Sequence, residues 1–183
     1  YVTTVNGTEL LHNQVILSGI TETYITTLFP GKALETQFTE PMPPGDILCH
    51  HYGRMYMADG NTIFFSEALR PGLTRLMDNY LPPFPSDIKV MLSHDTGLYI
   101  VADKTYFLPG GDPAQMVKRV AYPESGVFGT GVMVSASLFG LELAGNVPYW
   151  FSDKGPVIGI ANGQVLPLTA VSYTHLRAHE TPE

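Results

Sequence analysis

The chain has 183 residues, a formal net charge of -7 and a hydrophobic content of 44%, which suits one globular domain and excludes a disordered acidic chain. Its ten lysines and arginines are scattered, so we expect no direct binding to the phosphate backbone of a nucleic acid. No apolar run is long enough for a membrane-spanning helix, and we expect no membrane partner. The single cysteine, Cys49, excludes an internal disulfide framework.

Residues 1–43 are predicted to contain short β-strands followed by a linker. β-branched and aromatic residues gather in three segments, 1–5, 14–17 and 23–28. Asn6-Gly7 is typical of a tight hairpin turn. The prolines and glycines between positions 30 and 45 mark a linker or long loop. We therefore expect this part of the chain to be the end of a small β-sandwich-like segment.

An internal repeat begins near residue 44. Residues 55–65 align without gaps on residues 98–108, with Tyr, Thr and Phe shared at three places, and a weaker third copy covers residues 157–166. A repeat of this size that is built from several strands is typical of propeller blades. We predict an all-β chain in which residues 44–170 form a partial β-propeller-like array of about three antiparallel blades, too few to close alone. An ordinary β-meander with similar hairpins is the alternative.

Three connecting segments are predicted from their caps and turns. Residues 66–70 read as a short helical turn that is capped by Ser66 and stopped at a Pro-Gly pair. Asp112, followed by Pro113, reads as the N-cap of a helix with proline in its first turn. Residues 132–138 read as a further strand.

Histidines gather in two places that the repeat makes equivalent. Cys49, His50 and His51 end one predicted strand, and His94 lies at the repeat position of His51. A metal site would also need a carboxylate such as Asp95. Adjacent residues of a strand point to opposite faces, so only two of the four side chains can converge easily. We therefore expect packed or exposed histidines and no metal site.

Two glycine-containing turns invite a ligand interpretation. Asp59-Gly60 could begin a calcium loop, but the remaining EF-hand positions are missing and a hairpin turn explains the pair better. The segment 110–113, Gly-Gly-Asp-Pro, could cradle a phosphate, but it lacks the lysine of a P-loop. A loop that leads into a capped helix is the simpler interpretation, and we expect no cofactor.

The sequence contains no local motif that is typical of a catalytic serine or of a catalytic pair of carboxylates. The serines considered are Ser66, Ser93 and Ser137, and none lies in a Gly-x-Ser-x-Gly elbow. The carboxylates considered as a glycosidase pair are Glu67, Asp95 and Asp153, whose separation only a structure can give. We predict no catalytic residue and no enzyme activity.

The aromatic residues of the predicted strands are expected to form a core between blades. A sugar-stacking platform is the alternative. The residues concerned are Phe64, Phe65, Tyr106, Phe107, Phe139, Tyr149, Trp150 and Phe151.

Several short motifs of the repeats resemble bacteriophage virion proteins with propeller-like repeats, of the kind associated with the tail. They are Tyr-Gly-Arg-Met-Tyr-Met-Ala at 52–58, Gly-Leu-Tyr-Ile-Val-Ala-Asp at 97–103 and Trp-Phe-Ser-Asp-Lys-Gly at 150–155, with the segments 63–72, 107–113 and 163–165. The resemblance implies a structural component of the tail or head-tail connector region, located in the virion and contacting other virion proteins, and a homo-oligomer is compatible with it. The alternatives are a glycan-binding or carbohydrate-active β-propeller and an extracellular adhesion repeat.

The last residues have a different origin in our interpretation. Residues 171–181, Val-Ser-Tyr-Thr-His-Leu-Arg-Ala-His-Glu-Thr, resemble a translated transposon-end sequencing adapter. We therefore expect residues 171–183 to be an artefactual, disordered tail. The alternative is a natural polar tail in which His175 and His179 bind a metal.

Overall fold

The computed structural model describes residues 36, 38–140 and 145–168. The chain divides into two compact units, Tyr1–Glu40 and Pro41–Glu183, and almost all of the described residues belong to the second. The predicted strands and the hairpin turn before residue 30, and the predicted tail 171–183, lie outside the described residues. Within the described part, the structure is all-β, with four antiparallel sheets and three short 3₁₀ turns but no α-helix. The all-β prediction is confirmed.

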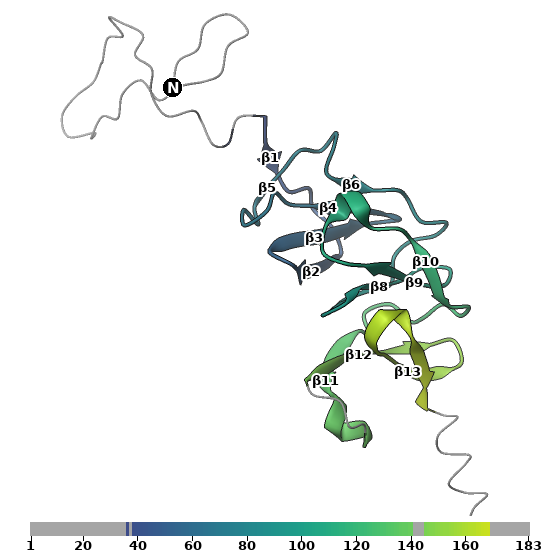
Figure 1. Ribbon diagram of the computed structural model, residues 1–183. Helices are drawn as coiled ribbons and strands as arrows, with labels where there is room; N and C mark the ends of the chain where they lie inside the picture. The colour runs from purple at the N-terminus through teal and green to yellow at the C-terminus, as the bar shows by residue number, and fades with distance from the viewer. Residues whose placement is uncertain (1–35, 37, 141–144, 169–183) are drawn as a thin grey trace, which may run out of the picture. The chain divides into compact units, whose positions relative to one another are not determined.

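The first sheet has the strand order β2-β3-β4-β6 (Figure 1). Its strands are β2 (Ile47–His51), β3 (Arg54–Asp59), β4 (Thr62–Phe65) and β6 (Tyr80–Leu81). A separate pair of short strands, β1 (Glu40–Pro41) and β5 (Leu73–Thr74), forms the two-stranded sheet. The turn between β3 and β4 has Gly60 at a φ of 55°, a conformation that glycine adopts at no steric cost.

The second and third sheets are built in the same manner, each from four strands in chain order (Figure 1). The second contains β7 (Val90–His94), β8 (Gly97–Val101), β9 (Thr105–Pro109) and β10 (Arg119–Tyr122), with the 3₁₀ turn η1 (Pro113–Gln115) after β9. The third contains β11 (Val132–Ser135), β12 (Asn146–Ser152), β13 (Gly155–Gly159) and β14 (Val165–Pro167), with η2 (Ala136–Phe139) and η3 (Ala161–Gly163).

The predicted repeat corresponds to the first two sheets, with one local difference. β2 and β7 begin at Ile47 and Val90, and β3 and β8 begin at Arg54 and Gly97. Both pairs are 43 residues apart, which is the offset between residues 55–65 and residues 98–108 in the alignment. Inside the hairpins the register differs, because Tyr56 pairs with Phe65 whereas Tyr99 pairs with Phe107. The chain between the two paired residues is therefore one residue shorter in the second sheet. As a result, the ungapped alignment matches residues of the third strands that are displaced by one position in the structure.

The third copy of the repeat was placed one strand too late. Residues 157–166 cover parts of β13 and β14, the third and fourth strands of their sheet, whereas residues 55–65 cover β3 and β4, the second and third strands. The strand equivalent to β3 is β12, which carries Trp150. A short apolar segment before a turn fits any hairpin of a meander, because β-propensity favours the same few residue types in every strand.

Two of the three predicted connectors also differ from expectation. Residues 66–70 form no helical turn, because Glu67 and Arg70 are joined by an isolated antiparallel bridge. The strand predicted over 132–138 ends at Ser135, where the η2 turn begins. The predicted start at Asp112 is confirmed as one 3₁₀ turn, in which the Asp112 side chain accepts a hydrogen bond from the Ala114 amide, 3.1 Å long.

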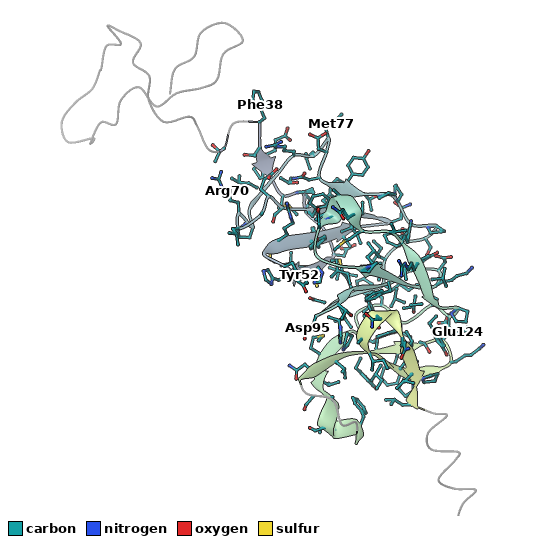
Figure 2. The ribbon with its side chains drawn as sticks, viewed as in Figure 1. Phe38, Tyr52, Arg70, Met77, Asp95 and Glu124 are labelled. Atoms are coloured by element: carbon teal, nitrogen blue, oxygen red, sulfur yellow. The ribbon has the colours of Figure 1, made fainter. Side chains whose placement is uncertain are left out.

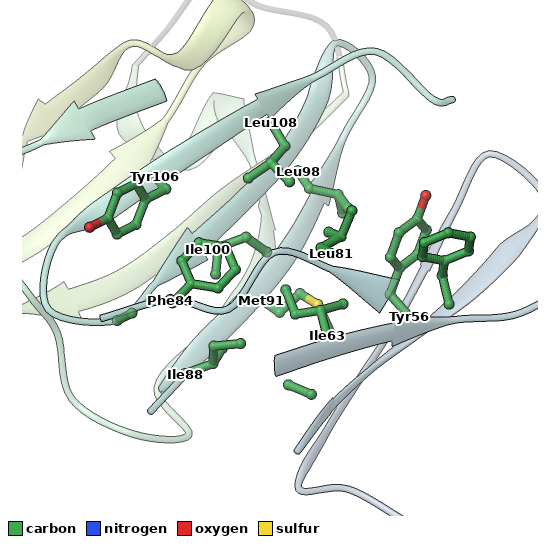
Figure 3. Close-up of a cluster of buried hydrophobic side chains, with 13 residues drawn as sticks. Tyr56, Ile63, Leu81, Phe84, Ile88, Met91, Leu98, Ile100, Tyr106 and Leu108 are labelled. Carbon is green, nitrogen blue, oxygen red and sulfur yellow. The ribbon is translucent and has the colours of Figure 1, made fainter. Parts of the chain in front are cut away.

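The sheets pack on one another face to face through two large apolar cores. The first core lies between the first and second sheets and includes Tyr56, Ile63, Leu98 and Ile100, all fully buried (Figure 3). The second lies between the second and third sheets and is centred on Tyr99 and Trp150, whose rings are 5.6 Å apart. β7 contacts both β2 and β12. The described residues thus form three stacked sheets, with no closed ring of sheets among them.

Each end of this stack has an apolar outward face. The leading face belongs to the third sheet and contains Val132, Val134, Val147, Tyr149, Phe151, Ile158 and Leu166. The η2 turn covers part of it, since Val147 and Ile158 are buried in a small cluster with Ala136, while Val132, Phe151, Leu166 and Leu138 are exposed. The trailing face belongs to the first sheet and contains the apolar residues Leu48, Met55, Met57, Phe64 and Tyr80, with the polar residues His50, Asp59 and Thr62 at its margins. These side chains are assigned to one face because they are paired across the strands and alternate along them.

Candidate functional site

His51 connects the first sheet to the second. It ends β2, is only 2% exposed, and places its Nδ1 at 2.9 Å from the Ser93 hydroxyl and its Nε2 at 2.8 Å from the Gly110 carbonyl oxygen. Because a carbonyl can only accept, Nε2 carries the proton and donates it, while Nδ1 accepts from Ser93 in the neutral ring. Burial lowers the pKa of His51 below its ordinary value, which favours this neutral form.

A cleft of about 350 Å³ opens beside this histidine, at the ends of β2 and β7. Its walls are formed by His50, His51, Tyr52, Ser93, His94 and Asp95. The Tyr52 hydroxyl donates to the Asp95 backbone carbonyl at 2.7 Å, so the two residues meet across the sheets (Figure 2). Gly111 makes room for the Tyr52 ring, because a Cβ at this position would lie 2.4 Å from the ring.

The Ser93–His51 pair has the geometry of a hydroxyl that donates to an imidazole. Such a contact lets the imidazole take up the serine proton, which is the first requirement for a serine nucleophile. The second nitrogen of His51 meets the Gly110 carbonyl, where a catalytic triad has a carboxylate. In this arrangement the pair holds β2 against β7 and the loop after β9.

The residues considered as metal ligands are only partly brought together: His50, His51, His94 and Asp95 line one cleft, and Cys49 is not among its lining residues. His94 lies in the same cleft as His51, but its Nδ1 is 3.0 Å from the Thr96 hydroxyl, and burial lowers its pKa. Burial raises the pKa of Cys49 to about 11, so its thiol stays protonated at neutral pH. Among the described residues, no group of three or more His, Cys, Asp or Glu side chains is placed to hold a metal ion.

Glu67 lies in a second cleft, of about 330 Å³, which residues of the first sheet form together with Asp112, Pro113 and Ala114 at η1. Its Oε1 accepts from Asn79 Nδ2 at 3.0 Å and is 3.2 Å from Arg75 Nε, so the carboxylate is held in one orientation. Arg54 and Asp112 line the same cleft. This cleft combines a fixed carboxylate with donors from arginine and amide groups, which suits a small polar ligand.

The other serines and carboxylates that were considered in the sequence analysis lie apart from one another. Asp95 lines the His51 cleft, and Asp153 is exposed in the turn between β12 and β13. Ser66 is fully buried and accepts a hydrogen bond from the Met55 amide. Ser137 lies in η2, with its hydroxyl 2.8 Å from that of Ser135. Only Ser93 of these candidates contacts a histidine in the described part of the chain.

The two glycine-containing turns have the predicted simple conformations. Asp59 pairs with Thr62 across the hairpin, so Asp59-Gly60 begins a tight turn between β3 and β4. Gly110 has a φ of 82° and leads into η1, as expected for a loop before a capped turn.

Four of the eight aromatic residues named in the sequence analysis belong to the core between the sheets, as predicted. Phe65, Tyr106, Phe107 and Trp150 are buried and pack between the sheets. Tyr149 and Phe139 are half-buried and stack with ring centroids 5.9 Å apart. Phe151 is 43% exposed on the leading face.

Sequence reasoning missed the pairing of His51 with Ser93. It treated His51 as a partner of His94, which lies one residue further along the equivalent strand. The repeat carried the signal, because it places the end of β2 beside the end of β7. The Glu67–Arg75–Asn79 arrangement had no such signal, since it depends on the course of the irregular segment between β4 and β6.

Comparison with models of known protein families and with curated proteins found no match. Among the described residues, no helix has the length and apolar character needed to cross a membrane.

Proposed function

We propose that the chain is a structural component of a bacteriophage virion, in the tail or head-tail connector region, and that it acts through protein–protein contacts. The observation that carries this proposal is the leading face. None of the residues in β11, β12, β13 and β14 is charged. Monomeric proteins rarely expose a large contiguous apolar patch. An apolar, uncharged sheet face at the end of a stack is typical of a surface that another protein covers.

The stack itself supports a propeller-like arrangement of blades. Each of the three sheets is a four-stranded antiparallel meander, which is the unit of a β-propeller. In the middle sheet, β7 contacts strands of both neighbouring sheets, as expected where early strands of successive blades approach a common axis. In this proposal the sheets are the rigid framework and their outward faces are the contact surfaces.

The polar groups near the sheet ends favour a structural role over a reaction centre. His51, Ser93 and Tyr52 make their hydrogen bonds between the first and second sheets. We infer that these contacts fix the angle between neighbouring blades. The protein would be made in the host cytoplasm and act in the assembled virion.

A binding experiment tests the proposal. The recombinant chain should bind tail or head-completion proteins encoded beside it, and the binding should weaken when Phe151 is replaced by Glu on the leading face. The matched control is Val120→Glu on β10, because Val120 is similarly exposed but lies outside that face. No binding to any of these proteins would contradict the virion assignment.

The Glu67 cleft favours a second candidate, a glycan-binding or carbohydrate-active protein. A carboxylate oriented by Arg75 and Asn79 is suited to hydrogen-bond sugar hydroxyls. Titration with a panel of mono- and oligosaccharides, together with glycoside hydrolysis assays, distinguishes this candidate. Binding or hydrolysis that Glu67→Gln abolishes, in a chain that does not bind virion proteins, would favour it over the first.

A further inference from the structure

The two ends of the stack expose positions that are buried in its middle. On the trailing face, Leu48 is 57% exposed, whereas Met91, its equivalent one repeat later, is 3% exposed. Met55 and Met57 are half-buried, whereas their equivalents Leu98 and Ile100 are fully buried. In the second sheet these positions are covered by the first sheet. Most of this face of the first sheet is apolar too, although His50 and Asp59 lie where the second sheet has Ser93 and the buried Ala102. No described sheet covers it.

The leading face likewise exposes positions whose equivalents are buried in the two preceding sheets. Tyr56 and Tyr99 lie on the second strands of their sheets and are fully buried under the following sheet. Tyr149 has the matching place on β12 and is half-buried; the Phe139 ring of η2 stacks on its ring and the Phe151 ring meets it edge-on. Beside it, Phe151 is 43% and Leu138 is 74% exposed.

We propose that the partner of these faces is a second copy of the chain, with the leading face of one copy packed on the trailing face of the other. This contact continues the two interfaces that the chain already makes, in which a face of one sheet covers the opposite face of the next. The contact is heterologous because it joins two different faces. Two copies can form it twice, once in each direction, and the two chains then make a closed ring. The closed dimer would contain six four-stranded sheets, within the range of about four to eight found in propellers.

Electrostatics adds a specific expectation. Each copy has a net charge of -7, so two copies repel one another at long range. The strands of the leading face carry no charge, so the contact itself gains nothing from ion pairs. Added salt screens the repulsion and should therefore increase the dimer fraction.

The inference rests on the proposed assembly role and names its first partner. Sedimentation velocity and light scattering on the full chain should give a concentration-dependent mass approaching twice 20.0 kDa. Phe151→Glu on the leading face and Leu48→Glu on the trailing face should each give a monomer. Val120→Glu, at a residue 58% exposed on β10, should leave the dimer unchanged. Circular dichroism and the fluorescence of the buried Trp150 verify that each variant is folded.

A mixture of the two disrupting variants makes the test specific for head-to-tail packing. The Leu48→Glu chain keeps an intact leading face and the Phe151→Glu chain keeps an intact trailing face, so together they should form a heterodimer through one contact. A dimer that only Phe151→Glu disrupts would show that the leading face pairs with itself, and would overturn the proposal. So would a wild-type monomer at every concentration, or open polymers. A monomer that still binds tail or head-completion proteins would overturn this inference and leave the assembly role standing.

Discussion

Two buried tyrosines give opposite expectations for the same substitution. Tyr56 on β3 and Tyr99 on β8 are equivalent in the repeat and fully buried. The Tyr99 hydroxyl donates to the chain between β13 and β14, where it contacts the Ile160 carbonyl and lies 2.8 Å from the Gln164 carbonyl oxygen. The Tyr56 hydroxyl has no hydrogen-bond partner among the residues that the structure describes. Burial raises the pKa of Tyr56 to about 12, so the group remains a neutral phenol.

The expected changes in unfolding free energy follow from these environments. Tyr99→Phe removes a hydrogen bond that joins the second sheet to the third, which should lower the unfolding free energy by about 1 kcal/mol. Tyr56→Phe removes a buried hydroxyl that makes no bond, so the unfolding free energy should stay the same or rise by up to about 1 kcal/mol. For a chain of this size, each 1 kcal/mol corresponds to a Tm shift of about 2–4 °C.

Urea unfolding measures both changes on one scale. The fluorescence of the single tryptophan, Trp150, reports on the interface between the second and third sheets, and far-UV circular dichroism reports on all sheets. Tyr80→Phe is the control, because Tyr80 is exposed and should leave the unfolding free energy unchanged. If Tyr56→Phe destabilises the chain as much as Tyr99→Phe does, the claim that the Tyr56 hydroxyl is unpaired is refuted.

Three further substitutions test other contacts. Burial lowers the pKa of His51 in the folded chain below 6.5. As the pH falls, the unfolded chain therefore binds a proton at this histidine before the folded chain does. The stability that His51 contributes is complete above pH 6.5 and is lost as the pH falls. His51→Gln should therefore reduce the loss of unfolding free energy between about pH 7.5 and about pH 5, and an unchanged loss would contradict the assignment. Gly159→Ala should lower the Tm, since its Cβ would lie 2.7 Å from the Tyr99 ring, and an unchanged Tm in a thermal melt would contradict that contact. Asp112→Ala removes a side-chain cap from one exposed turn, so urea unfolding should show a loss below about 1 kcal/mol, and a larger loss would mean that Asp112 has a further role.

The sequence predicted the parts of the fold that depend on local patterns. The offset between β2–β3 and β7–β8 was readable because Tyr56 and Tyr99 pack in the same way under the following sheet. Asp59-Gly60 predicted its turn because few residues other than glycine adopt a positive φ without strain. The loop into η1 was readable from Asp112 and its cap.

The remaining features depended on contacts between distant segments. The bridge between Glu67 and Arg70 replaced a predicted helical turn, because the Ser66 amide and hydroxyl bond to the Met55 backbone and hold the segment to β3. The position of His51 opposite Ser93 required the angle between two sheets, which no local pattern encodes. The strand predicted over 132–138 was too long, because Ala136 in its second half has little preference for strands and is buried in the η2 turn.

The complete burial of β8 has a consequence for how the chain opens. All five residues of β8 are buried, because its sheet is the only one of the three described four-stranded sheets with a sheet packed on each face. Its backbone amides should exchange with deuterium only when the whole stack unfolds, whereas the amides of β11 and β14, at the edges of the third sheet, should exchange by local fraying. Proteases that act on transiently opened chain would therefore remove the third sheet first, and the segment from β7 to β9 would be the last to be cut.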